Sequence, residues 1–219
     1  VASRGGWEEP DTARRFAAFC ERATAELAPV LGRVCTLNEP NIVAVAGFLA
    51  GTFPPGRRDV EARRRANAVL AEAHRLAVDA VRAAAPGVPV GLTLSMSAYE
   101  AVDGGEEKLE QIRHRMEDEF LAATAGDDFL GVQAYSRSRI GPAGAVAPDP
   151  GARLVPSLGH EFWPAALEAA VRRAWDVTSG RLPILVTENG IAAEDDATRI
   201  EYVCEALAGL ARKLPHYGK

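Results

Sequence analysis

The sequence predicts an α/β protein in which about four parallel strands are covered by helices. Segments with apolar residues three and four positions apart, typical of amphipathic helices, alternate with short apolar runs. These runs are apolar at nearly every position, as in parallel strands that are buried on both faces. The expected helices are 11–28, 59–84, 105–125, 164–178 and 195–213, and the expected strands are 34–37, 88–95, 128–135 and 182–190.

The first half of the chain carries clear signals for helix starts and ends. In the first helix Phe16 and Cys20 lie on one face, and Asp11 is a residue type that favours the N-cap. Glycines and prolines gather in residues 41–56, so this stretch is expected to be a loop. The long second helix is expected to end at Pro86, and the second strand is expected to begin at residue 88.

The second half continues the alternation of helix and strand. The third helix repeats apolar residues such as Leu109 and Phe120 at helical spacing. Residues 136–160 are expected to form a long loop, and loops of that length in compact domains are usually functional. Glu161 directly after it would either line a substrate or anchor the loop. Pro164 falls where a first helical turn tolerates proline.

Composition narrows the class of protein. The 219 residues are 47% hydrophobic and 25% charged, which favours one globular core over disorder. The formal net charge of −5 argues against nucleic-acid or anionic-membrane binding, and no apolar run is long enough to span a bilayer. Cys20, Cys35 and Cys204 lack metal-ligand spacing. We therefore expect unpaired thiols in a reducing, cytoplasmic compartment, with no metal and no cofactor.

Polar residues stand where the predicted strands end. Glu39 follows the first strand, Gln133 and Tyr135 lie at the end of the third, and Glu188 ends the fourth. Four such strands fit either a small open sheet or half of an eight-stranded barrel, whose active site forms at the carboxyl ends of the strands. Cleavage of a glycosidic bond needs two facing carboxyl groups, one protonated and one ionised. Glu39 and Glu188 are candidates for that pair, although other enzymes also use paired carboxylates.

Two motifs at these strand ends resemble the paired signatures of family 1 glycoside hydrolases, the β-glucosidase and β-galactosidase family. They are TLNEP at residues 36–40 and VTENG at residues 186–190, and the family usually has TFNEP and ITENG. The stretches DDFLGVQAYSRSRIGP and GHEFWPAALEAAVRRA also resemble the family, and in the same order. The resemblance covers nearly the whole chain and is specific because two separate motifs occur on the expected strands.

The resemblance implies a retaining double-displacement hydrolysis of β-glucosides or similar β-glycosides. Glu39 would be the general acid/base, and Glu188 the nucleophile that forms a covalent glycosyl-enzyme. Asn38 would bind the sugar 2-hydroxyl, and Tyr135 would position the nucleophile. Gln133 stands where the family usually has an asparagine, so it would contribute to substrate binding in a modified way.

The resemblance also implies a domain organisation. Residues 1–219 would be one region, matching the fourth to seventh strands of a (β/α)8 barrel and lacking strands one to three and eight. Both ends look cut, and most groups of the sugar-binding site would be missing, so we expect the isolated chain to be nearly inactive. The alternative is a truncated, inactive half-barrel that binds sugar weakly or self-associates through its open sheet edges. Another glycosidase family with the same barrel fits the two motifs less well.

Overall fold

The computed structural model describes residues 4–155, 159–213 and 217. The chain divides into two compact units. Unit 1 comprises Val1–Leu94 and Met116–Gly131, and unit 2 comprises Ser95–Arg115 and Val132–Lys219. Both units contain strands and helices, which confirms the predicted α/β class.

The main sheet has four strands in the order β1-β2-β4-β9. They are β1 (Val34–Asn38), β2 (Val90–Ser95), β4 (Phe129–Ala134) and β9 (Ile184–Asn189), and all four were predicted. Strands β1 and β2 are parallel, with Val34 opposite Val90 and Asn38 opposite Thr93. Strand β4 belongs to both units, with Phe129–Gly131 in unit 1 and its last three residues in unit 2.

The two outer strands are less buried than their composition predicts. Strands β2 and β4 are buried almost throughout, as expected. In β1, however, Cys35 is exposed, and in β9 the side chain of Val186 is 39% exposed. The prediction of burial on both faces was therefore wrong for β1 and β9, because strands at the ends of the strand order have a neighbour on one side only.

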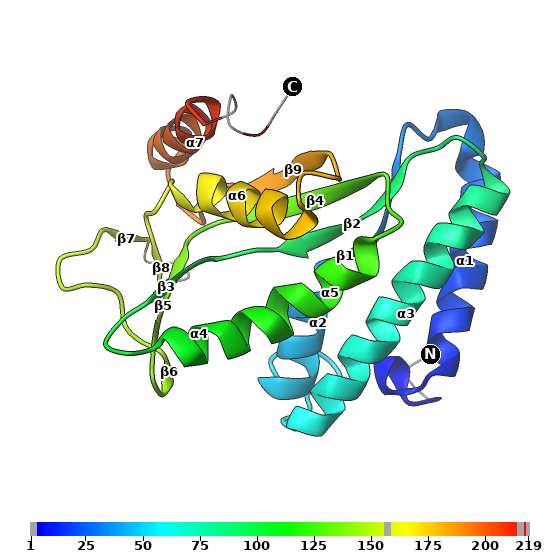
Figure 1. Ribbon diagram of the computed structural model, residues 1–219, viewed down its shortest axis with the longest axis horizontal. Helices are drawn as coiled ribbons and strands as arrows, with labels where there is room; N and C mark the ends of the chain where they lie inside the picture. Colours follow the sequence, from blue (N-terminus) through cyan, green and yellow to red (C-terminus); the bar gives the residue numbers. More distant parts are fainter. Residues whose placement is uncertain (1–3, 156–158, 214–216, 218–219) are drawn as a thin grey trace. The chain divides into compact units, whose positions relative to one another are not determined.

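Unit 1 is built around two long helices, α1 (Asp11–Leu27) and α3 (Val60–Ala84), which lie side by side (Figure 1). Small side chains let them pack closely: Ala13, Val69 and Ala73 form one core cluster, and Cys20, Ala77, Val78, Val81 and Val90 form a second. Helix α3 begins after Asp59, whose carboxylate accepts hydrogen bonds from the backbone N–H groups of Glu61 and Ala62. The Asp11 position proves to be the first helical residue rather than the N-cap.

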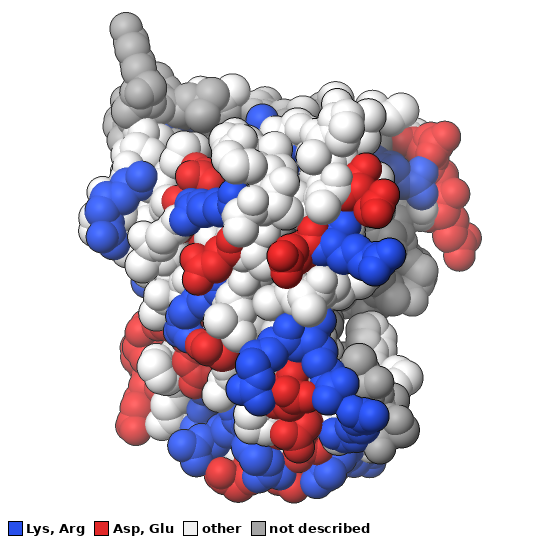
Figure 2. Space-filling view, turned by 90° about the vertical axis from the view of Figure 1, so that its right-hand side faces the viewer, with Lys and Arg blue, Asp and Glu red and all other residues white. Residues whose placement is uncertain are grey.

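Basic and acidic side chains are interspersed on the face that Figure 2 shows. Within α1, Arg14 pairs with Asp11 at 2.9 Å, and within α3, Arg64 pairs with Glu61 at 3.0 Å. Arg65 of α3 pairs with Glu8 at 2.7 Å, which ties the helix to the short 3-10 helix η2 (Gly6–Glu8). Exposed pairs of this kind contribute little stability individually.

The predicted loop 41–56 begins with helix instead. Helix α2 (Pro40–Ala44) continues into a π-helical turn, η4 (Val45–Leu49). Pro40 occupies the first helical turn, where its missing N–H costs nothing. The helix is too short for a periodic pattern, and burial of residues such as Asn41 and Ala44, rather than helix propensity, stabilises it.

The third predicted helix is a series of shorter helical segments. They are α4 (Glu106–Arg113), the π-helical turn η5 (His114–Asp118), α5 (Glu119–Leu121) and the 3-10 turn η6 (Ala122–Thr124). A further 3-10 turn, η3 (Ala28–Val30), follows α1. The apolar periodicity correctly predicted helical structure here, but the changes between α-, π- and 3-10-helical turns left no signal in the sequence.

Unit 2 contains strands that the sequence did not reveal. Part of the predicted loop 136–160 forms β5 (Arg137–Gly141), β6 (Gly144–Ala145) and β7 (Leu154–Val155), while residues 156–158 lie outside the described residues. Strand β5 pairs in parallel with β3 (Ala98–Ala101), and β7 pairs with β8 (His160–Glu161). These strands are short, and β5 is largely polar, so pairing with other segments rather than local pattern determines them. Helices α6 (Ala166–Thr178) and α7 (Asp196–Ala211) complete the unit, as predicted.

Gly91 permits a close approach of two strands within unit 1. A Cβ atom at this position would lie 2.2 Å from the backbone oxygen of Phe129, far inside van der Waals contact. Replacing Gly91 by alanine is therefore expected to lower the free energy of unfolding by roughly 2–3 kcal/mol, because β2 and β4 must separate.

Urea denaturation of the 219-residue chain measures this loss. Gly126→Ala is the matched control, since a Cβ there would meet nothing within 4 Å. A Gly91→Ala chain as stable as the Gly126→Ala chain would contradict the strand spacing described.

Among the residues that the structure describes, no helix is long and apolar enough to cross a membrane.

Candidate active site

Glu39 stands at the junction of β1 and α2 in unit 1. Its backbone N–H donates to the carbonyl oxygen of Thr93 at 3.1 Å, and its own carbonyl accepts from the N–H of Ile42 at 2.9 Å. Its φ of 45° places Glu39 in the left-handed region, which is uncommon for residues other than glycine. Such backbone conformations cluster at functional sites, where the surroundings hold them in place.

Asn38 precedes Glu39 and meets the same threonine. The hydroxyl of Thr93 lies 3.1 Å from the carbonyl oxygen of Leu37 and 3.2 Å from Oδ1 of Asn38. Thr93 is buried on β2. Its hydroxyl and its carbonyl oxygen therefore hold Asn38 and Glu39 of the TLNEP motif in place at the end of β1.

A chain of three side chains, the half-buried Thr36 and the buried His74 and Asp127, connects β1 to α3. His74, fully buried on α3, lies 2.7 Å through Nδ1 from the Thr36 hydroxyl and 3.1 Å through Nε2 from Asp127 Oδ1. With the proton on Nε2, His74 donates to Asp127 and its Nδ1 accepts the hydrogen of Thr36. Thr36 lies three residues before Glu39, and the contact therefore helps to fix the strand that carries it.

Glu188 lies near the end of β9 in unit 2, where two side chains from β4 and the residue after it reach its carboxylate. The amide of Gln133 donates to Oε1 at 2.5 Å, and the hydroxyl of Tyr135 donates to Oε2. Gln133 is buried, whereas Glu188 is exposed and accessible. Hydrogen bonds to both oxygens fix the orientation of the carboxylate.

The predicted site residues thus fall into two groups. Asn38 and Glu39 come together in unit 1, and Gln133, Tyr135 and Glu188 come together in unit 2. The structure adds Thr93 to the first group and Asn189 and Tyr202 to the second. Sequence reasoning missed Thr93 and Tyr202, and it interpreted Asn189 as a turn residue rather than a ligand. The one available signal for Tyr202 was a tyrosine within the otherwise apolar pattern of the last helix.

Arg137 joins the segments that follow β4. Its guanidinium pairs with Glu161 at 2.6 Å, with Glu100 at 2.6 Å and with Asp149 at 3.0 Å. It also lies over the ring of Trp163, 3.9 Å from the centroid. The hydrogen bonds that Arg137 donates to the Glu161 carboxylate are the main reason that the pKa of Arg137 is raised above its usual value. Glu161, buried in this network, therefore anchors the loop, which was one of the two expected roles.

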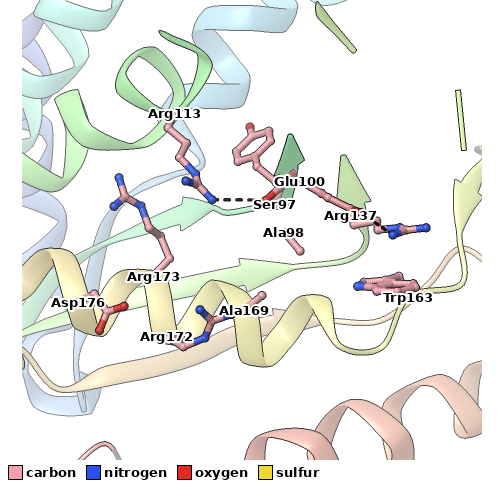
Figure 3. Close-up of a pocket in the computed structure, with 11 residues that line it drawn as sticks. Ser97, Ala98, Glu100, Arg113, Arg137, Trp163, Ala169, Arg172, Arg173 and Asp176 are labelled. Carbon is pink, nitrogen blue, oxygen red and sulfur yellow. Dashed lines mark hydrogen bonds and ion pairs between the residues drawn. The ribbon is translucent and has the colours of Figure 1, made fainter. Parts of the chain in front are cut away.

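A cavity of about 360 Å³ lies beside this network in unit 2. Figure 3 shows Arg113 and Arg173 on one side of it and Arg137 with Trp163 on the other. Arg113 pairs with Glu110 at 3.1 Å, and Arg172 at the same cavity pairs with Glu168 at 3.2 Å. Carboxylates thus pair with three of the arginines that line the cavity, Arg113, Arg137 and Arg172.

Among the described residues, His, Cys, Asp and Glu side chains form no group of three or more that could hold a metal ion.

Comparison with known proteins identifies the family. The model of glycosyl hydrolase family 1 matches residues 1–139, a span that includes Glu39, Gln133 and Tyr135. The chain belongs to glycosyl hydrolase family 1. The resemblance expected from the two motifs is thereby confirmed.

Relatives in family 1 cover different parts of the chain. A β-glucosidase of Agrobacterium sp. is 40% identical over 101 residues, 46% of this chain and 22% of the relative. Thermostable β-glucosidase B of Thermobispora bispora is 30% identical over 257 aligned positions, 94% of this chain and 52% of the relative. The chain thus spans about half the length, or less, of these two relatives.

Solved structures of similar proteins agree on the fold. The β-glycosidase BGL167 matches with a TM-score of 0.85 and 36% identity, over 99% of this chain and 57% of that one. A hyperthermophilic β-glucosidase from Pyrococcus furiosus matches with a TM-score of 0.84 and 25% identity, over 96% of this chain and 48% of that one. The predicted fold class, a partial (β/α)8 barrel, is confirmed.

Proposed function

We propose that this chain is the fourth-to-seventh-strand region of a retaining β-glycosidase that hydrolyses β-glucosides. The observation that carries the proposal is the pair of donors, Gln133 and Tyr135, that hold both oxygens of Glu188. The names of the relatives, β-glucosidase and β-galactosidase, support a β-glycoside as substrate. The region 1–219 then lacks strands one to three and strand eight of its barrel.

The two glutamates divide the reaction between them. Glu188 attacks the anomeric carbon while Glu39 gives its proton to the departing oxygen, so a glycosyl–Glu188 ester forms and the glycosidic bond breaks. Glu39, now ionised, takes a proton from water, which attacks the same carbon and releases Glu188. Asn38 binds the sugar 2-hydroxyl, and Gln133 and Tyr135 line the sugar site beside the nucleophile.

The test is hydrolysis of a chromogenic aryl β-glucoside by the product of the complete gene, with the corresponding α-glucoside as control. Proton NMR during the reaction identifies the anomer that forms first, and retention predicts the β-anomer. If the α-anomer appeared first, the double displacement would be wrong. The 219-residue chain alone is expected to show little activity, because groups that position the sugar are missing.

A second candidate is a half-barrel without catalytic activity that self-associates through its sheet edges. Strands β1 and β9 end the strand order, and the 39% exposure of Val186 supports an edge open to another chain. Size-exclusion chromatography and the β-glucoside assay, applied both to the 219-residue chain and to the product of the complete gene, separate the candidates. A monomer that hydrolyses the β-glucoside would exclude the half-barrel. If the 219-residue chain and the product of the complete gene each formed an inactive dimer, the glycosidase would be excluded.

We also propose the cytoplasm as the location. Cys20 is buried, Cys35 and Cys204 are exposed, and all three are free thiols, as suits a reducing compartment.

A further inference from the structure

Two side chains from beyond Glu188 hold the backbone at the end of β4. The amide of Asn189 donates to the carbonyl oxygen of Ala134 at 2.8 Å. The hydroxyl of Tyr202, on α7, donates to the carbonyl oxygen of Tyr135 at 2.6 Å. Consecutive carbonyl groups of one short segment are therefore fixed by side chains that follow the nucleophile in the chain.

Tyr202 is suited to hold this position. Its side chain is fully buried, and its ring meets that of Phe162 edge to face, with centroids 5.3 Å apart. Burial raises the pKa of Tyr202 to about 12, so the hydroxyl keeps its hydrogen at neutral pH. That single hydrogen has two acceptors within reach, the carbonyl oxygens of Tyr135 at 2.6 Å and Trp163 at 3.2 Å, and the shorter contact is the stronger.

The segment held in this way carries the donor to the candidate nucleophile. The carbonyl of Tyr135 is bonded to Tyr202, and its hydroxyl donates to Glu188. A side-chain hydroxyl reaches a carboxylate only if its own backbone is correctly placed, and shifts of about 1 Å are costly in catalytic sites.

We infer that Asn189 and Tyr202 are positioning residues, which set the backbone of residues 134–135 so that the Tyr135 hydroxyl meets the Glu188 carboxylate. Neither residue needs to touch the substrate. The catalytic meaning of the contact rests on the proposed function, but the positioning itself does not. The motif TENG thus contributes two neighbouring residues with different tasks, since Glu188 reacts and Asn189 holds the strand beside it.

The experiment follows Tyr135 directly and needs no turnover. The chain contains four tyrosines, namely Tyr99, Tyr135, Tyr202 and Tyr217, and labelling them with ¹³C at Cζ yields one NMR signal each. Tyrosine-to-phenylalanine variants assign the signals. As the pH is lowered from neutral, the Tyr135 signal is expected to shift when Glu188 takes up a proton, and this shift is expected to vanish in Glu188→Gln.

Tyr202→Phe removes one hydroxyl and keeps the ring. In this variant the Tyr135 signal is expected to move towards its position in Glu188→Gln and to lose most of its response to pH. Tyr217→Phe is the matched control, because it removes a hydroxyl whose bond to Glu168 is also 2.6 Å long. In the control, the Tyr135 signal is expected to stay unchanged.

A Tyr135 signal that keeps its position and pH response in Tyr202→Phe would overturn the inference. Unchanged chemical shifts of the Tyr99 and Tyr217 signals show that the variant is folded. If Tyr202→Phe is not folded, the variant Asn189→Ala tests the same inference, because it removes the hydrogen bond to the carbonyl oxygen of Ala134. In Asn189→Ala the Tyr135 signal is likewise expected to lose most of its response to pH. Because the signals report a contact and not hydrolysis, a lack of glycosidase activity would refute the proposed function and leave this result interpretable.

Discussion

Replacing Glu188 by glycine in the product of the complete gene is expected to lower hydrolysis of an aryl β-glucoside by roughly 10⁴-fold or more, as loss of a covalent nucleophile does in other enzymes. The glycine leaves space on the face of the sugar opposite the leaving group. Added azide is expected to attack the anomeric carbon from that space, expel the aryl oxygen and restore part of the rate as the α-glycosyl azide.

The control for this experiment is Glu194→Gly, which removes an exposed carboxylate six residues further along the chain. Its activity is expected to match that of the unaltered protein. Full activity of Glu188→Gly would show that another residue is the nucleophile. Loss of activity without rescue by azide would indicate a role in binding or folding instead.

Replacing Glu39 by glutamine is expected to show the acid/base role through the leaving group. For a glucoside with a poor leaving group the rate should fall by about 10²–10⁴-fold, because the departing oxygen lacks its proton. For a dinitrophenyl glucoside, which leaves without a proton, formation of the glycosyl-enzyme should be nearly unaffected. Glutamine keeps the length of the side chain and does not alter the left-handed backbone at this residue.

Measured values of kcat/KM with a series of aryl glucosides check this expectation. In the variant, kcat/KM should depend steeply on the acidity of the phenol, and in the unaltered protein only weakly. Equal losses for all leaving groups would contradict the acid/base assignment of Glu39 and favour a general loss of binding or of structure.

The two glutamates were found from local signals. Glu39 follows an apolar run and precedes a proline, which cannot continue a strand, and Glu188 ends an apolar run, so their strand-end positions follow from neighbouring residues alone. The short strands β3 and β5 gave no such signal. Arg137 and its neighbours in β5 are polar, and they form a strand only because they pair with β3 (Ala98–Ala101).

The sequence by itself determined the α/β alternation, the main helices and strands, the family motifs and the candidate glutamates, because all of these depend on residues close together in the chain. The resemblance already implied that Tyr135 positions Glu188, but only the tertiary structure decided that Gln133 also donates to Glu188 and that Asn189 and Tyr202 hold the backbone of residues 134–135. Gln133 and Glu188 are 55 residues apart, and Tyr135 and Tyr202 are 67 residues apart. The tertiary structure also decided that β1 and β9 remain partly exposed. Hydrogen bonds and burial between distant segments depend on the packing of the folded chain. Apolar periodicity and residue propensity are local properties, so they do not predict that packing.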